Sequence, residues 1–316
     1  MDLRERLRLL KAAGAARAAE ERAVARTAGE PAAVSGAPAV QPPAPAAQPL
    51  SLCDGMEGLL VATEAGYAFR LERRYPLDYL RGPLPLGWTL RLPASVWPLV
   101  GRVPPVFDPR KAVFVDTETT GLAGGTGTYA FLVGLGFYRG DEFVVRQYFL
   151  RDYPEEDAML SAIAADLAPF TCLVSFNGKS FDWPLLETRF RMARRRPPLS
   201  GAPHLDLLHP ARRIWSARLQ GCSLQDLERS ILGVVRQGDV PGARIPALYF
   251  DYLRSGDASP LVQVVEHNRL DILSLAALAG WMGQMVADPL GITPDGELLC
   301  GDDLYQLGRL FEARGR

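Results

Sequence analysis

Apolar residues gather into short, closely spaced runs between residues 112 and 150, and this pattern predicts a β-sheet. The runs are AVFV, TYAFLVGLGFY and EFVVRQYFL, which begin at residues 112, 128 and 142. They are rich in β-branched and aromatic residues, which favour strands, and Gly140-Asp141 marks the turn between the last two. Because strands joined by such short connections can pair only as antiparallel neighbours, we expect an antiparallel meander.

Beyond the meander, the apolar spacing changes to patterns typical of helices, interrupted by one further strand. In order, the segments are an amphipathic stretch over 154–170, the strand CLVSF over 172–176, a helix over 180–196 and a long apolar helix from about 260 to 285. We expect Ser180 to cap the helix that it begins, with Pro184 tolerated in the first turn. A meander followed by a helix, a strand and more helices predicts an α/β fold with one mixed sheet.

Weaker patterns on either side of this region divide the chain into four parts. These are residues 1–50, an N-terminal helix and a disordered Ala/Pro linker; residues 51–110, a small lead-in that packs on the main domain; residues 111–290, the main domain; and residues 291–316, a C-terminal helical tail. The arginine-rich start of the chain suits a solvated helix better than a binding arm. The Ala/Pro-rich segment has too few large apolar groups to form a core.

Composition and charge exclude several classes of protein. The formal net charge is −1, so the chain is not a general polycation, and any contact with nucleic acid must come from local basic patches. The 4 cysteines lie far apart without a CxxC pair, which argues against a zinc site of the usual spacing and against a disulfide framework. The N-terminus carries charges throughout and predicts neither a signal peptide nor a membrane span, so we expect a cytoplasmic protein.

Two carboxylates at the end of a buried strand are the first chemical signal. Asp116 and Glu118 directly follow the apolar run that begins at residue 112, and their i, i+2 spacing places both side chains on one face of the strand. Burial penalises the charged forms, and the two groups repel each other. A bound cation would compensate for both effects.

Two further acids stand in similarly conspicuous places. Asp182 follows a strand at a helix N-terminus, where the helix dipole favours an anion. Asp271 lies inside a strongly apolar helix, and His267 shares its face at i−4. If these acids and the strand pair gather in one cleft, they form a site for hard divalent cations. The chemistry that needs such a site is in-line displacement at phosphorus, assisted by a pair of cations about 4 Å apart.

The motifs DTE, NGKSFD and HNRLD, in this order, resemble those of the DEDD superfamily of 3′–5′ exonucleases, and more closely those of the bacterial YprB-type exonucleases. The resemblance covers roughly residues 111–285. It implies the ribonuclease H-like fold of DnaQ-like exonucleases, with a mixed five-stranded sheet flanked by helices. It also implies hydrolysis of DNA from a free 3′ end with two divalent cations, Mg²⁺ or Mn²⁺, in DNA repair with a helicase partner. No nucleotide cofactor and no membrane are expected.

The resemblance also assigns roles to the acids. Asp116 is expected to bridge both cations, Glu118 and Asp271 to complete one metal site, and Asp182 to serve the other through water. His267 is expected to act as the catalytic base. It is separated from Asp271 by three residues, which is the spacing of the tyrosine class of this superfamily. The resemblance makes Asp206 a supporting residue at the start of a helix rather than a metal ligand.

Residues near the acids are candidates for contact with nucleic acid. The candidates are Thr119, Thr120, Gly121 and Leu122 in the loop TTGLAGGTG, followed by Asn177 and Lys179. Backbone N–H groups of the loop would meet the terminal nucleotide, although the loop could equally be a flexible hairpin connection. Asn177 and Lys179 could touch a phosphate, or Asn177 could instead cap its turn.

Two clusters of arginine leave their role open. Arg194, Arg195 and Arg196 end one predicted helix, and Arg212 and Arg213 follow HLDLLHP. Each cluster could track a nucleic-acid backbone or form a solvated face, because the helix dipole alone favours cations at a helix C-terminus.

Two other functions compete with a DNA exonuclease. A 3′–5′ exoribonuclease could use the same scaffold, since a fold does not choose the sugar and no motif here reads a 2′-hydroxyl. A non-catalytic scaffold that binds nucleic acid is a different class of function. The intact set of Asp116, Glu118, Asp182 and Asp271 argues against a scaffold.

Overall fold

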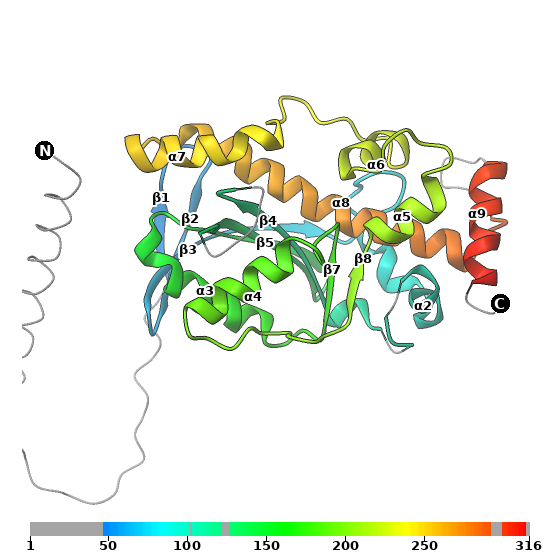
Figure 1. The fold of residues 1–316 in the computed structure, drawn as a ribbon, viewed down its shortest axis with the longest axis horizontal. Coiled ribbons are helices and arrows are strands. Elements are labelled where there is room, and N and C mark those ends of the chain that lie inside the picture. The colour runs from blue at the N-terminus through cyan, green and yellow to red at the C-terminus, as the bar shows by residue number, and fades with distance from the viewer. Residues whose placement is uncertain (1–46, 102, 106, 122–126, 292–298, 314–316) are drawn as a thin grey trace, which may run out of the picture. The chain divides into compact units, whose positions relative to one another are not determined.

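A mixed sheet forms the centre of the computed structural model, which describes residues 47–101, 103–105, 107–121, 127–291 and 299–313 (Figure 1). These residues belong to one unit, which begins at Pro45. The strands are β1 Gln48–Ser51, β2 Glu57–Thr63, β3 Gly66–Pro76, β4 Ala112–Thr119, β5 Ala130–Arg139, β6 Glu142–Phe149, β7 Cys172–Ser175 and β8 His204–Asp206. Their order across the sheet is β1-β2-β3-β6-β5-β4-β7-β8.

The strands from β1 to β4 in this order pair antiparallel, whereas β7 and β8 continue the sheet in parallel with β4. The predicted meander is β4, β5 and β6, and the expected α/β fold with a mixed sheet is confirmed. The expected number of five strands is wrong, because the sheet has 8. The additional strands come mainly from the segment that was expected to pack as a separate lead-in.

The hairpin of β2 and β3 is part of the sheet because β3 pairs with β6 from Phe69 to its last residue. The register runs from Phe69 opposite Phe149 to Pro76 opposite Glu142. A tight turn joins β2 to β3, and Gly66 there has a φ of 122°, which favours glycine. β1 begins at Gln48, inside the segment predicted as linker, while the predicted N-terminal helix and residues 27–46 lie outside the described residues.

The helices follow the predicted order. They are α2 Trp97–Val100, α3 Glu156–Leu167, α4 Asp182–Met192, α5 Leu208–Trp215, α6 Leu224–Ser230, α7 Ile245–Ser255, α8 Val262–Ala287 and α9 Gly301–Glu312. Short 3₁₀ turns occupy Leu86–Arg91, Ala94–Val96, Pro109–Lys111, Tyr153–Glu155, Gly242–Arg244 and Ser259–Leu261. The expected Ser180 cap of α4 is wrong, because Ser180 lies in the preceding turn and Phe181 precedes the first helical residue. Pro184 does lie in the first turn, as predicted.

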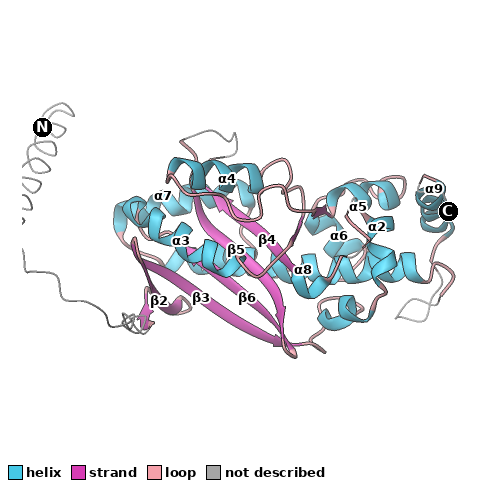
Figure 2. Ribbon diagram, turned by 90° about the horizontal axis from the view of Figure 1, so that it is seen from below, coloured by secondary structure: helices cyan, strands magenta, loops and turns pink. Residues whose placement is uncertain are grey.

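Side chains on β4 alternate between two core clusters, one on each face of the sheet. Phe114 packs in the cluster that contains Ile272 of α8, whereas Val113 and Val115 pack in the cluster that contains Met159 of α3. The long helix α8 crosses the fold against β4, β5 and β6 (Figures 1 and 2). The alternation therefore decides which helix each later side chain of β4 can meet.

The segment Ser259–Ala287, which includes α8, is long and apolar enough to cross a membrane by length and composition alone. However, 78% of its most apolar window is buried inside the fold. A buried core helix meets the same criteria, and the packing of α8 against the sheet accounts for its composition.

Candidate active site

The four candidate acids come from β4, α4 and α8 and lie where the parallel strands end. Asp116 and Glu118 share the face of Phe114 and so point toward α8, which carries Asp271. The carboxyl ends of parallel strands meet at one edge of a sheet, a common place for ligand sites in α/β folds. A register shift between Glu118 and Thr119 bends the end of β4 at this point.

Asp116 is held by a buried amide from α8 that the sequence did not single out. The Nδ2 atom of Asn268 donates to Asp116 Oδ2 at 2.8 Å, and Gln147 Nε2 donates to Asn268 Oδ1 at 2.8 Å. Asn268 is 0% exposed. It approaches β5 so closely that a Cβ on Gly134 would collide with its amide. Glycine at that position therefore lets Asn268 orient the carboxylate.

Asp182 is reached from the opposite face of β4. Thr117 lies between the two acids of the strand, so its side chain points toward α4, and its hydroxyl donates to Asp182 Oδ1 at 2.5 Å. Burial raises the pKa of Asp182 to about 6, against the effect of the Thr117 hydrogen bond. β4 thus orients acids on both of its faces, two directly and one through Thr117.

His267 and Asp271 occupy successive turns of α8, as their spacing predicts. The distance from His267 Nε2 to Asp271 Oδ2 is 3.4 Å, and that to Glu118 Oε1 is 4.0 Å. The other ring nitrogen, Nδ1, lies 2.7 Å from Asp239 Oδ1. Glu118, His267 and Asp271 each offer one ligand atom, and these atoms all lie within 4.8 Å of one another. The geometry can accommodate a cation.

Electrostatics connect this group to the other two acids. Burial raises the pKa of Asp116, and the neighbouring charges of Asp271, Asp182 and Glu118 raise it further. Burial and the charges of Asp271 and Asp182 also raise the pKa of Glu118. Burial raises the pKa of Asp271, although Arg236 and His267 act in the opposite direction. Buried carboxylates that repel one another form an oxygen-rich donor set, which fits hard divalent cations.

Arg236 enters the site from the segment between α6 and α7, and sequence reasoning missed it. Its side chain is 4% exposed and donates two hydrogen bonds to the Glu228 carboxylate, both of 2.7 Å. It also contacts Asp271 Oδ1, and Asp239 Oδ2 lies 3.4 Å away. Arg236 and Asp239 stand in a short polar stretch, VVRQGD, without periodicity. Nothing in that stretch indicated that its side chains turn inward.

A cavity of about 500 Å³ opens beside the acids. Its lining residues include Glu118, Thr119, Gly121, Asn177, Phe181 and Asp182. Three predicted contacts, Thr119, Gly121 and Asn177, therefore face the same space as the acids. Thr120 does not line it; its hydroxyl accepts the backbone N–H of Tyr129 at 2.9 Å. Leu122 lies outside the described residues.

Asp206 supports the turn that precedes Asp182. It is the last residue of β8 rather than the start of a helix. Its carboxylate accepts the backbone N–H groups of Asn177 at 2.8 Å, Lys179 at 3.1 Å and Leu208 at 3.1 Å. These bonds occupy both of its oxygens and hold Asn177 at a φ of 64°. Asp206 therefore holds the turn that precedes Asp182.

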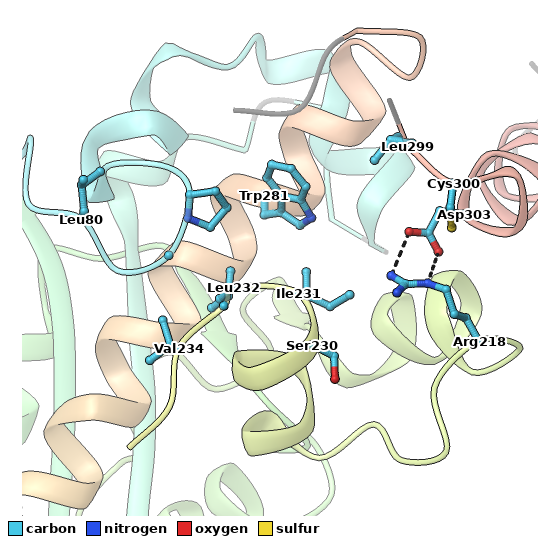
Figure 3. Close-up of a pocket in the computed structure, with 13 residues that line it drawn as sticks. Leu80, Arg218, Ser230, Ile231, Leu232, Val234, Trp281, Leu299, Cys300 and Asp303 are labelled. Carbon is cyan, nitrogen blue, oxygen red and sulfur yellow. Dashed lines mark hydrogen bonds and ion pairs between the residues drawn. The ribbon is translucent and has the colours of Figure 1, made fainter. Parts of the chain in front are cut away.

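A second cavity, of about 650 Å³, lies apart from the acids, between the segment after α6 and the start of α9 (Figure 3). Apolar side chains such as Leu232 and Trp281 line much of it. At its edge, Arg218 and Asp303 form a two-bond ion pair with distances of 3.1 and 3.0 Å. None of the candidate acids lines this cavity, whereas Glu118 and Asp182 line the 500 Å³ cavity. A substrate that meets these acids must therefore enter the 500 Å³ cavity.

The pKa of Asp182 leads to a prediction about stability. In EDTA at about pH 8, Asp182→Asn should be more stable than wild type by on the order of 2–3 kcal/mol, because the wild-type carboxylate is buried in its charged form. A group with a raised folded pKa contributes stability below its unfolded pKa of 3.8 and loses it as the pH rises through about 6. The advantage of the variant should therefore vanish near pH 4. Urea unfolding at both pH values measures it, and an advantage that is independent of pH would contradict the prediction.

Comparisons with known proteins identify the family of the chain. A family model described as RNase_H superfamily matches residues 113–283, just over half of the chain. The uncharacterized protein YprB of Bacillus subtilis (strain 168) is 34% identical over 229 residues, which are 71% of this chain and 54% of that protein. The chain thus spans about half the length of this relative. A solved family B DNA polymerase from the hyperthermophilic archaeon Pyrobaculum calidifontis matches with 14% identity and a TM-score of 0.40, covering 78% of this chain and 34% of that one.

The matched range contains the acids of β4, α4 and α8. It confirms the ribonuclease H-like fold, and the similarity to YprB confirms the resemblance drawn from the motifs. With a fold used by nucleases and an acidic site that suits a metal ion, the chain belongs to the RNase H superfamily.

Proposed function

We propose that this protein is a 3′–5′ exonuclease that hydrolyses phosphodiester bonds of DNA with two divalent cations, Mg²⁺ or Mn²⁺. One observation carries the proposal: buried acids from three elements converge beside His267 and an open cavity. The DEDD-like order of the motifs supports the polarity of cleavage. The resemblance to that superfamily also supports a role in DNA repair with a helicase partner, and the charged N-terminus and the lack of a CxxC pair support a cytoplasmic location.

In this proposal, Asp116, Glu118 and Asp271 would hold one cation, and Asp116 and Asp182 would serve the other, Asp182 through water. When bound, such cations lower the pKa of an attacking water and stabilise charge on the leaving oxygen. The protein supplies the geometry: Asn268 fixes Asp116, and the Thr117 hydroxyl fixes Asp182.

His267 is the proposed base. Its Nδ1 atom faces the Asp239 carboxylate at 2.7 Å, and a carboxylate can only accept a hydrogen bond. The proton therefore resides on Nδ1, which leaves Nε2 toward Glu118 and Asp271 with a free lone pair. This nitrogen is positioned to accept the proton of the attacking water.

The cavity beside the acids is the proposed site of the terminal nucleotide. A volume of about 500 Å³ suits one small ligand. Phe181, which lines it, is 58% exposed and offers a ring face on which a base can stack. Thr119, Gly121 and Asn177 are proposed to contact the sugar and phosphate of this nucleotide.

End-labelled oligonucleotides test the proposed function. Purified protein is incubated with single- and double-stranded DNA and RNA in Mg²⁺, Mn²⁺ or EDTA. We expect mononucleotides to be released from the 3′ end of DNA with either cation and no release in EDTA. Preferential degradation of RNA would make the protein an exoribonuclease. Binding without cleavage in any cation would make it a scaffold and overturn the proposal.

A further inference from the structure

Two adjoining cavities away from the catalytic acids are lined with cations. One, of about 350 Å³, is lined by Lys179, Arg213 and the acid Asp206 among others. The second, of about 520 Å³, is lined by Arg212, Arg213 and Arg309 among others. Arg213 of α5 lines both cavities, and the second also reaches Arg309 of α9. We call Lys179, Arg213, Arg212 and Arg309 the α5–α9 basic path.

The four cations of this path have no salt-bridge partner among the described residues. All four side chains belong to exposed residues. Arg195 of the other predicted arginine cluster differs, since it pairs with Asp157 and Glu64. One acid, Asp206, is among the residues that line these cavities, and its carboxylate accepts backbone N–H groups rather than forming a salt bridge with a cation of the path.

Helix dipoles do not explain this arrangement. A dipole favours a cation at the end of each helix separately, which would suit Arg212 and Arg213 on α5 and Arg309 on α9. It gives no reason for Lys179, which lies in a turn, to line the same cavity as Arg213. Like charges from two helices and a turn repel one another unless an anion lies between them.

The far end of the path is held in place by packing. α9 packs against α5 and buries Leu307 and Leu310. The ion pair between Arg218 and Asp303 ties the start of α9 to the segment after α5 (Figure 3). Arg309 is therefore presented beside the arginines of α5 by a docked helix.

The near end of the path adjoins the catalytic cavity. Asn177 lines the catalytic cavity, whereas Lys179, two residues later, lines the basic one. The Asp206 carboxylate binds the backbone N–H groups of both and so fixes the turn that separates the two spaces. A strand that leaves the catalytic cavity across this turn meets Lys179 first.

We propose that the α5–α9 basic path binds consecutive phosphates of the DNA strand whose 3′ end lies in the catalytic cavity. This inference rests on the proposed function and adds the route of the substrate. Contacts to phosphates position a strand without reading its sequence, which suits an enzyme that must accept every base. Binding through the path is correspondingly sensitive to salt.

The test measures binding of single-stranded DNA of about 20 nucleotides as a function of salt. All variants are made in the full chain carrying Asp116→Asn, which allows Mg²⁺ to be present without turnover. Arg212→Gln with Arg213→Gln removes two charges of the path. Arg194→Gln with Arg196→Gln is the matched control, because these two arginines are exposed and lie outside both cavities. Arg309→Gln probes the path from a different helix.

Each lost phosphate contact lowers the slope of log K against log salt by about 0.7 for single strands. We expect the slope to fall by about 1.4 in the α5 double variant and by about 0.7 in Arg309→Gln, with Kd raised roughly tenfold in the double variant. The control should match the parent chain. Equal losses in the control and the α5 variant, or unchanged slopes in both path variants, would overturn the inference. If the path variants lose binding as expected but the wild-type chain cleaves no oligonucleotide, the proposed function alone is refuted.

Discussion

Asp116→Asn is expected to lower the rate of phosphodiester hydrolysis by about 10³-fold or more. The charges of Asp271, Asp182 and Glu118 all raise the pKa of Asp116, so its carboxyl interacts with each of the other three acids. An amide removes the charge that both cations would share. Cations stabilise a transition state by several kcal/mol, and each 1.36 kcal/mol corresponds to a factor of ten in rate. Single-turnover cleavage of labelled DNA measures the loss.

Stability separates a catalytic role of Asp116 from a structural one. In EDTA, the melting temperature of Asp116→Asn should equal or exceed that of wild type, because neutralising a buried charge relieves repulsion. Asp251→Asn is the matched control, since Asp251 is an exposed acid on α7 that pairs with Arg254. It should cleave like wild type. A sharply lower melting temperature in Asp116→Asn, or a rate within a few-fold of wild type, would contradict the proposed role.

His267→Ala is expected to slow cleavage by about 10²–10⁴-fold, the usual contribution of a positioned base. The loss should appear in kcat, because the four acids remain to hold the cations. Asp239→Asn should also lower kcat, because it leaves the His267 ring in place but removes the carboxylate that accepts the hydrogen bond from Nδ1. Wild-type turnover in His267→Ala would remove the residue from the mechanism.

The spacing of His267 and Asp271 allows a further control. Three residues separate them, as in the tyrosine class of the DEDD superfamily. We therefore expect His267→Tyr to retain more activity than His267→Ala. Equal damage from both substitutions would show that the spacing does not make the two side chains interchangeable, while leaving the assignment of the base intact.

Local patterns in the sequence were sufficient for the centre of the fold. The apolar runs of β4, β5 and β6 are separated by short turns, so antiparallel pairing followed directly. The i, i+2 spacing of Asp116 and Glu118 placed them on one face of β4, and the i, i+4 spacing of His267 and Asp271 placed them on one face of α8. The structure brings these two faces together.

Features that depend on distant pairing could not be predicted in this way. The segment of β2 and β3 predicts a small hairpin, which the structure has. That β3 joins the central sheet depends on its register against β6, which lies far along the chain. β8 has only three residues, so it becomes a strand through its pairing with β7. The same limit applies to side chains: Asn268 matters because Gly134 leaves room for it, and the two residues come from different elements.

The arginine clusters show the same limit. Their sequences alone gave each cluster equal standing as a nucleic-acid contact or a solvated face. The structure distinguishes them by position, because Arg212 and Arg213 line the two basic cavities, whereas no arginine of the 194–196 cluster does, and Arg195 pairs with Asp157 and Glu64. Arg236 and Asp239 gave no signal at all, although the fold turns them toward Asp271 and His267.

Calorimetric titration of Mn²⁺ into the full chain, in the presence of a nucleoside 5′-monophosphate, measures directly whether these acids form a metal centre. A pair of metal ions per chain is expected for wild type and for the Asp251→Asn control. Asp116→Asn should bind Mn²⁺ at least about tenfold more weakly, because the carboxylate shared by both ions is lost. The same affinity and the same number of ions in Asp116→Asn and wild type would contradict the metal centre on which the proposed activity depends.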